Sequence, residues 1–176
     1  MAVILTALCL SAEAQPRHRQ SQPSRFYVFG EYDYYTDSSD FTGAGVGLGW
    51  NFTRYFGLQA GVQFLTSTVQ IPNSSVIADS DATVFYGEAK FPVPLTDNFS
   101  IYGTAGLAYA DTTARLTTVY GTPYIPSSLS ASSTGYRLGI GAEYWFTDNW
   151  GLRAGWRRIE IDGTGSDIGV GIALRF

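Results

Sequence analysis

The stretch IGVGIALRF, residues 168–176, alternates between two kinds of side chain at every position. One face carries only large apolar residues, namely Ile168, Val170, Ile172, Leu174 and Phe176. The other face carries glycine, alanine and arginine. A period of two residues is typical of a β-strand whose two faces meet different surroundings. The sequence therefore predicts a strand with one fully apolar face and one small or polar face.

The same alternation recurs upstream, and we expect eight strands between residues 25 and 176. Their expected ranges are 26–35, 43–52, 56–64, 83–91, 99–113, 136–146, 150–161 and 168–176. Short linkers follow the second, fourth and sixth strands, whereas longer stretches rich in Ser, Thr, Asp and Pro follow the first, third, fifth and seventh. This spacing predicts antiparallel hairpins with short turns at one rim and long loops at the other. In the seventh strand Ile159 and Ile161 fall out of phase, which predicts either a bulge or an exit of the strand from the membrane near Arg157 and Arg158.

The composition favours a sheet and excludes some functions. The chain holds 20 Gly, 12 Tyr, 11 Phe and 4 Trp, and aromatic residues favour strands whereas interior glycines disfavour helices. No apolar run reaches the roughly 18 to 20 residues that a membrane-spanning helix needs. The net charge is −4 and no Lys/Arg cluster is present, so nucleic acid is not an expected partner.

The amino-terminal residues differ from the rest. Residues 1–14, MAVILTALCLSAEA, have the apolar core and the small-x-small ending of a secretory signal peptide, and a buried strand is the alternative. Residues 15–24, QPRHRQSQPS, are expected to form a flexible polar leader before a barrel domain at 25–176. Cys9, the only cysteine, would leave with the signal peptide, so no disulfide is expected.

The alternation fits either a soluble barrel with an apolar interior or a membrane barrel with an apolar exterior. Two features favour the membrane barrel. The polar face is mostly glycine with few charges, unlike a solvent-exposed face, and aromatic residues of the apolar face collect near the strand ends, as at a membrane interface. The expected interface aromatics are Phe26, Trp50, Phe52, Phe56, Phe91, Phe99, Tyr144, Phe146, Trp150, Trp156 and Phe176. Phe64, Phe85, Tyr109 and Tyr136 join Trp156 in a second set towards the long loops.

The last strand, with Ile172, Leu174 and the terminal Phe176, resembles the carboxy-terminal assembly signal of outer-membrane β-barrels, although Leu174 stands where an aromatic residue is common. Residues 25–176 as a whole resemble the small eight-stranded barrels of the outer-membrane protein A and opacity-protein type. The resemblance implies an all-β, eight-stranded antiparallel up-and-down transmembrane β-barrel, exported through the periplasm to the bacterial outer membrane. It further implies a monomer that contacts outer-membrane lipid and lipopolysaccharide and is assembled through its last strand by the outer-membrane assembly machinery.

Charged residues on the polar face are expected to form a network that fills the lumen, because an eight-stranded barrel is only wide enough for its own side chains. The expected members are Glu31, Asp33, Glu88, Lys90, Arg137, Glu143, Arg153 and Arg175. A three-residue turn at 147–149 would pair Trp145 with Gly151 and Glu143 with Arg153. The glycines of GAGVGLGW, residues 43–50, are expected to leave space for Tyr27, Phe29 and Glu31 of the first strand.

No catalytic residue, metal site or cofactor is expected. The only histidine, His18, lies in the leader, which argues against the lipid A deacylases and outer-membrane proteases of this barrel class. A carboxylate-only mechanism at Glu31 and Asp33 is the remaining enzymatic alternative. The long-loop rim is expected to be acidic, with a divalent-cation site as an alternative to solvated loops, through Asp37, Asp40, Asp79, Asp81, Asp162 and Asp167.

Three function classes follow. The leading hypothesis is a non-enzymatic barrel that works through its exterior and loops, in envelope integrity, adhesion or surface interaction. The alternative is a narrow porin-like channel for small solutes or ions. A lipid-modifying enzyme is the third.

Overall fold

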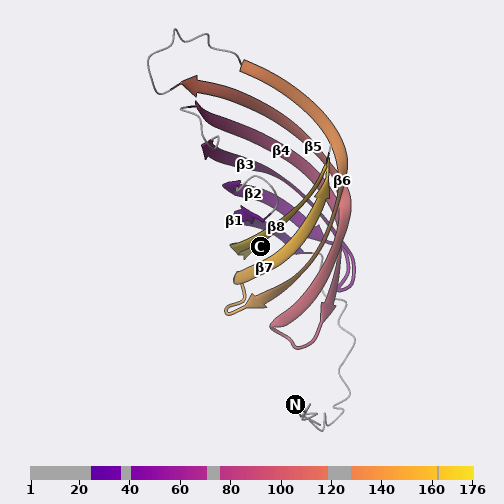
Figure 1. Ribbon diagram of the computed structural model, residues 1–176. Helices are drawn as coiled ribbons and strands as arrows, with labels where there is room; N and C mark the ends of the chain where they lie inside the picture. The colour runs from indigo at the N-terminus through magenta and orange to yellow at the C-terminus, as the bar shows by residue number, and fades with distance from the viewer. Residues whose placement is uncertain (1–24, 37–40, 71–75, 119–127, 162) are drawn as a thin grey trace, which may run out of the picture.

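The computed structural model describes residues 25–36, 41–70, 76–118, 128–161 and 163–176, so the expected signal peptide and leader lie outside the described residues. The strands are β1 Arg25–Tyr35, β2 Thr42–Asn51, β3 Gly57–Gln70, β4 Val76–Pro94, β5 Phe99–Thr118, β6 Ser128–Trp145, β7 Trp150–Glu160 and β8 Thr164–Arg175. Each strand pairs antiparallel with the next and β8 pairs with β1, which closes a barrel (Figure 1). The expected all-β, eight-stranded antiparallel barrel is confirmed. No helix in the described ranges is long and apolar enough to cross a membrane.

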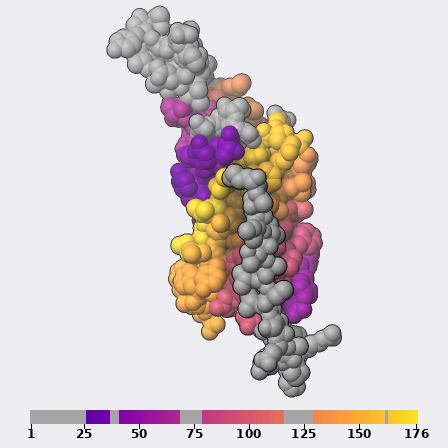
Figure 2. Space-filling model, turned by 60° about the horizontal axis from the view of Figure 1, so that its bottom comes forward, coloured from indigo at the N-terminus to yellow at the C-terminus, as the bar shows by residue number. Residues whose placement is uncertain are grey.

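Pairing of β1 with β8 closes the barrel, and the start of β1 and the end of β8 lie together at the rim of the short turns. The register of β1 and β8 runs from Tyr27 opposite Arg175 to Tyr35 opposite Asp167. The Phe176 amide donates a hydrogen bond of 3.0 Å to the Phe26 carbonyl. In the space-filling view the indigo start of the barrel lies beside its yellow end (Figure 2). Both ends of the barrel domain therefore meet at one rim, as an even number of strands requires.

The repeated Thr-Asp-Asn sequence builds the same short turn twice. The Thr96 hydroxyl accepts hydrogen bonds from the backbone amides of Asn98 and Phe99, at 3.3 and 3.0 Å. The Thr147 hydroxyl accepts the equivalent bonds from Asn149 and Trp150, at 3.3 and 2.9 Å. A threonine hydroxyl that satisfies backbone amides stabilises a tight reversal of the chain. These turns set the registers of the hairpins β4–β5 and β6–β7.

The predicted register of β6 and β7 is confirmed. Trp145 lies opposite Gly151, and Glu143 lies opposite Arg153. A Cβ atom built at Gly151 would come within 2.8 Å of the Trp145 indole, so only glycine leaves room for this ring. The short turn and the glycine together place both charged residues on the lumen face.

Of the two alternatives for β7, the bulge is wrong, and the membrane exit stays a prediction. Pairing continues without interruption on both sides, with Arg158 opposite Leu138 in β6 and opposite Ser166 in β8. Alternation also continues, because Arg157 and Ile159 are buried while Arg158 is exposed. Ile159 is apolar and yet faces inward, because the interior of the barrel becomes apolar towards the long-loop rim, where Ile159 packs.

Strands β3 to β6 run further towards the long loops than the sequence predicts. β3 has 14 residues, β4 has 19, β5 has 20 and β6 has 18, whereas β7 has 11. Parts of the expected loops are therefore strand, and together they form an extension of the sheet beyond the barrel (Figure 1). We define the extension as residues 65–70, 76–83, 111–118 and 128–135. Its pairing is regular, with Asp81 opposite Thr113 and Asp111 opposite Ser132.

Candidate functional site

Glycines of β2 make room inside the barrel for large rings of β1. Tyr27 lies opposite Gly49 and Phe29 lies opposite Gly47. A Cβ atom at either glycine would overlap the ring of its partner, as expected from the sequence. The space for Glu31 comes from β8 instead, because a Cβ at Gly171 would lie 2.8 Å from the Glu31 Cγ atom.

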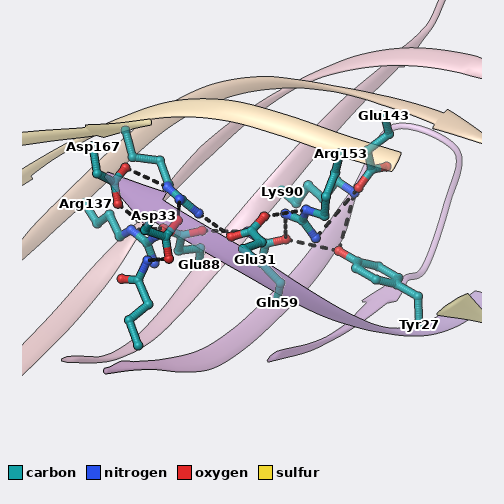
Figure 3. A network of polar contacts seen from close by, with 12 residues as sticks. Tyr27, Glu31, Asp33, Gln59, Glu88, Lys90, Arg137, Glu143, Arg153 and Asp167 are labelled. Carbon is teal, nitrogen blue, oxygen red and sulfur yellow. Dashed lines mark hydrogen bonds and ion pairs between the residues drawn. The ribbon is translucent and has the colours of Figure 1, made fainter. Parts of the chain in front are cut away.

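Nine charged side chains are buried in the lumen, and we call them the lumen network (Figure 3). They are the carboxylates Glu31, Asp33, Glu88, Glu143 and Asp167 and the cations Lys90, Arg137, Arg153 and Arg157. They project from β1, β4, β6, β7 and β8. Five carboxylates against four cations leave the network close to neutral. Seven of the eight residues that the sequence predicted are members.

At the short-turn end of the lumen network, Lys90 is a fully buried cation. Its Nζ atom lies 2.5 Å from Glu143 Oε1. It also lies 4.7 Å from the Tyr27 ring centroid and 4.8 Å from that of Tyr102, so two aromatic faces surround it. Arg153 approaches the same Glu143 oxygen only to 3.8 Å. The Glu143–Arg153 pair expected from the register therefore exists, but Lys90 is the closer partner of Glu143.

In the middle of the lumen, Gln59 joins groups from several strands. Its amide nitrogen donates a hydrogen bond of 2.6 Å to Glu88 Oε2. Its amide oxygen accepts hydrogen bonds from the Tyr27 hydroxyl, at 3.1 Å, and from Arg153 Nη2, at 3.3 Å. Arg153 in turn binds Glu31, with 2.7 Å between Nε and Oε1. A neutral amide can serve donors and acceptors at once, and here it links anionic and cationic parts of the network.

At the long-loop end, Arg157 contacts three carboxylates. Its Nε atom lies 2.8 Å from Asp167 Oδ1, and its two terminal nitrogens bind Glu31 and Asp33. Asp33 also accepts a hydrogen bond of 2.6 Å from the Gln63 amide. Arginine suits this position because its planar guanidinium presents several donors in fixed directions.

Arg137 is fully buried beside this cluster. Its Nε atom lies 3.2 Å from Glu88 Oε1, and its Nη2 atom lies 3.9 Å from Asp167 Oδ2. The guanidinium carbon lies 3.9 Å from the centroid of the Tyr86 ring. Stacking on this ring gives the cation a partner on its flat face, while the carboxylates approach its edge.

Two members of the network are missed by the sequence pattern. The pattern places Arg157 at a bulge or a membrane exit. It places Asp167 on the acidic loop rim, which is wrong because Asp167 is fully buried in β8 opposite Arg157. Parity is the signal that could have found both. Arg157 is four residues after Arg153, and Asp167 is two residues before Gly169, so both share the phase of the lumen face.

Arg175 does not lie in the lumen network, which corrects the expectation from the sequence. Its Nε atom donates to the Asp148 carbonyl, and its guanidinium carbon lies 4.3 Å from the Trp145 ring centroid. Arg175 has the inward phase, but it is the last residue of β8 and so lies at the short-turn mouth, beyond the other charges.

The outer face of the barrel is apolar and carries the expected aromatic residues. All of them are exposed except Phe99, which is half-buried. Near the short turns the rings form neighbouring pairs, with centroid distances of 5.3 Å for Trp50–Phe52, 5.9 Å for Phe52–Phe56, 5.8 Å for Phe56–Phe91 and 6.1 Å for Phe26–Phe176. Trp156 lies nearer the other rim, opposite Ile140 and Ile168. Such a continuous apolar surface is far larger than the patches that water-soluble monomers expose, and an aromatic band at a rim is typical of a membrane interface.

The comparisons agree with this surface. The protein family described as "Outer membrane protein beta-barrel domain" matches this chain over residues 2–176. The chain belongs to this outer-membrane β-barrel family. Its place is therefore the outer membrane of a bacterial cell, and the exposed apolar face is its lipid-facing side. No curated protein matches the chain.

Solved structures share the fold of this outer-membrane barrel at low sequence identity. The N-terminal β-barrel domain of Pseudomonas aeruginosa OprF is 18% identical with a TM-score of 0.59, and the match covers 89% of this chain and 100% of that one. A major outer membrane protein from Thermus thermophilus is 14% identical with a TM-score of 0.70, covering 87% and 99%. The Yersinia pestis protein Ail is 15% identical with a TM-score of 0.59, covering 87% and 97%.

Two cavities of the outer-membrane barrel lie at opposite mouths, with the lumen network between them. The cavity at the short-turn mouth has a volume of about 270 Å³ and a largely polar lining that includes Asn51, Asp148 and Arg175. The cavity at the long-loop mouth has a volume of about 450 Å³ and a largely apolar lining. Within the described ranges, no group of three or more side chains of the kinds that bind metals converges on one point.

Proposed function

We propose that this protein is a non-enzymatic outer-membrane barrel whose lumen is closed by the charge network and whose work is done by its exterior and its long-loop rim. Its role is structural, adhesive or otherwise one of surface interaction. The observation that carries the proposal is the lumen network itself, in which each of four buried cations contacts at least one buried carboxylate.

Closure is favoured by the energetics of buried charges. The pairs join different strands, since Lys90–Glu143 links β4 to β6 and Arg153–Glu31 links β7 to β1. Separating such a pair leaves an uncompensated charge in a site with little water, which is strongly unfavourable. An eight-stranded barrel has no spare interior width for a water path beside these side chains.

The absence of a catalytic role is supported by the pairing of the carboxylates. General acid–base catalysis needs a carboxyl group that can reach a substrate proton. Glu31 and Asp33, the enzymatic alternative from the sequence, are both buried and both bind Arg157. The only histidine of the chain is His18, which precedes the first barrel strand and belongs to none of the eight.

A surface role is supported by the extension and by the names of two proteins whose solved structures are similar. The outward face of the extension is polar, with Asp81, Asp111 and Arg115 exposed. One similar structure is the attachment invasion locus protein of Yersinia pestis, in complex with a heparin analogue, and another is Neisserial surface protein A. We place the long loops and the extension outside the cell, and the short turns and both ends of the barrel in the periplasm.

The partners follow from this placement. Outer-membrane lipid and lipopolysaccharide contact the apolar face, with the aromatic side chains at the interfaces. The assembly machinery of the outer membrane binds the last strand through Ile172, Leu174 and Phe176. The barrel acts as a monomer.

Conductance in a planar bilayer distinguishes a closed barrel from a narrow pore, which is the second candidate. The wild-type protein is expected to show no steady unitary conductance. Lys90→Ala removes a fully buried cation of the network and is expected to produce conductance events, whereas Arg158→Ala on the outer face of β7 is expected to resemble the wild type. Steady open conductance of the wild-type barrel would overturn the closed lumen and support the pore.

Lipid analysis tests the enzymatic alternative. Refolded wild-type protein is incubated with purified lipopolysaccharide, and the lipid A is analysed by mass spectrometry. No change of mass is expected. A change that Glu31→Gln abolishes would establish an enzyme and contradict the proposal.

A further inference from the structure

The polarity of the sheet inverts where the barrel passes into the extension. On the outer face of β4 and β5, the exposed rings of Phe85 and Tyr109 lie directly opposite each other, and exposed Asp81 and Asp111 lie further along their strands. The inner face changes in the opposite direction, because the lumen charges give way to apolar side chains such as Val84. Carboxylates on an outer face are unfavourable in hydrocarbon, so the extension stands in water beyond the lipid.

One border of the extension is a strand that is paired on one side only. Residues 128–134 of β6 pair with β5, beginning with Ser128 opposite Arg115. The pairing of β6 with β7 begins at Tyr136, opposite Glu160. Among the described residues, no strand pairs with residues 128–134 on their other side, and we call them the open edge (Figure 1). Alternate residues of such an edge direct their backbone N–H and C=O groups away from the sheet.

The open edge lacks the features that commonly prevent the addition of another strand. Its sequence, SLSASST, contains no proline and no charged residue. Its pairing with β5 runs without a bulge. Natural edge strands are commonly blocked by lysine, by proline or by a bulge. The opposite border of the extension, in β3, is unpaired only over residues 67–70 of the described chain and is therefore shorter.

The inner side of the open edge is apolar. Leu129 and Ala131 share the inward phase of β6, and both are exposed. The Leu129 side chain is 74% exposed, although the extension stands in water. Ala131 and Ile161 both line the long-loop cavity. A strand added beside β6 would cover these residues with its own apolar side chains, as neighbouring strands of a sheet do.

The outer side of the open edge is acidic. Asp111 is exposed on β5, directly opposite Ser132 of the open edge. The cation Arg115 lies opposite Asp79 of β4, which balances its charge. Asp81 and Asp111, in contrast, lie opposite uncharged residues on both sides. Basic side chains on the outer face of an added strand would therefore be attracted to this surface.

We propose that the open edge binds an extended segment of another polypeptide, which adds a strand to β6 and alternates apolar with basic residues. The backbone groups supply the hydrogen bonds, and the alternation matches the apolar inner side and the acidic outer side. The inference rests on the proposed function for the placement of the extension outside the cell. It does not rest on the closed lumen, so strand addition and conductance are tested separately.

Three fluorescent peptides of eight residues test the pairing with the full protein in phosphatidylcholine nanodiscs. The first alternates lysine and valine, the second has prolines in place of the two central valines, and the third has glutamate in place of lysine. Fluorescence anisotropy, corrected with empty nanodiscs, measures the dissociation constants. The lysine–valine peptide is expected to bind saturably. The other two are expected to bind about tenfold more weakly or less, because proline removes backbone donors and glutamate reverses the charge.

Variants of the extension locate the site. Ser132→Lys places a cation on the open edge and is expected to weaken the lysine–valine peptide by about tenfold or more. Thr66→Lys is the matched control, because Thr66 is exposed on the same outer face but is paired on both sides, with Thr42 and Asp81. Its binding is expected to equal that of the wild type. Leu129→Ser removes the apolar side chain and is expected to weaken binding by about three- to tenfold. Gel mobility before and after heating verifies that each variant is folded.

Three outcomes would overturn the proposal. The first is binding of the lysine–valine peptide that does not exceed the empty nanodiscs. The second is equal binding of the proline peptide, or binding that Ser132→Lys leaves unchanged, because the backbone of the open edge would then not be used. The third is a wild-type dimer that Ser132→Lys dissociates, because a second copy of the chain would then occupy the edge. A barrel without conductance and without activity on lipid A would leave the proposed function standing in all three cases.

Discussion

Arg157 and Arg158 are adjacent in β7, and yet Arg157 is buried among three carboxylates while Arg158 is exposed on the lipid side of the barrel wall. Successive residues of a strand point to opposite faces, so one peptide bond separates the interior from the exterior. The two residues have the same chemistry and the same secondary structure. They therefore form an internal control for the contribution of the lumen network.

Arg157→Ala is expected to lower the free energy of unfolding by about 3 to 5 kcal/mol, because it leaves Glu31, Asp33 and Asp167 without their shared cation. Arg158→Ala is expected to change it by less than about 0.5 kcal/mol. Urea titration of the protein refolded in liposomes measures both values. Equal effects of the two substitutions would show that the network does not stabilise the barrel.

Gly49→Ala is expected to destabilise the barrel by about 1 to 3 kcal/mol, because the added methyl group overlaps the Tyr27 ring inside the lumen. Gly87→Ala is the matched control, since a Cβ at Gly87 meets no atom within 4 Å. Its effect on stability is expected to be small. The same urea titration compares the two variants, and a larger loss for Gly87→Ala would contradict the assignment of inner and outer faces.

Ile172→Lys is expected to cost about 2 to 4 kcal/mol, because it places a charge near the middle of the lipid face. Ile172 is exposed and lies opposite Gly30 and Leu152, and Leu152 stands between the interface rings of Trp150 and Trp156 along β7. The fraction of protein that folds into liposomes measures the effect, with Ile172→Leu as control. Unchanged folding of the lysine variant would mean that this face does not meet lipid.

Asp111→Cys and Asp148→Cys test the orientation of the barrel in the cell. Both side chains are exposed, one in the extension and one in a short turn. A membrane-impermeant maleimide added to intact cells is expected to label Asp111→Cys alone, and both after the outer membrane is permeabilised. Labelling of Asp148→Cys alone in intact cells would reverse the proposed topology.

The strand number, the two faces and the β6–β7 register could be predicted because each depends on neighbours in sequence. Period-two alternation assigns the faces, and the three-residue turn at 147–149 fixes which residues lie opposite each other. Contacts across the lumen could not be predicted this way. Lys90 and Glu143 lie on β4 and β6, which are separated by β5, so their 2.5 Å contact depends on the closure and tilt of the whole barrel.

The extension escapes prediction for a different reason. Its strands are rich in Ser, Thr and Asp, residues that also dominate loops, and they carry no long apolar face. Hydrophobicity alone places Ile159 on the lipid face, and Arg157 has the same phase as Ile159 in β7. A rule based on hydrophobicity therefore misses Arg157 as a lumen residue, and with it Asp167, which lies opposite Arg157. The interior changes its polarity along the barrel axis, and a rule that gives each face one polarity fails where that change occurs.

The inversion of polarity along β4 and β5 also fixes how deeply the protein is immersed. If the barrel sank, the carboxylates of Asp81 and Asp111 would enter hydrocarbon, and if it rose, the rings of Phe85 and Tyr109 would leave the interface for water. Each displacement raises the free energy of the protein in the membrane, so the inversion opposes movement along the membrane normal in both directions. The height at which the extension stands above the lipid is therefore set by the sequence of the strands themselves.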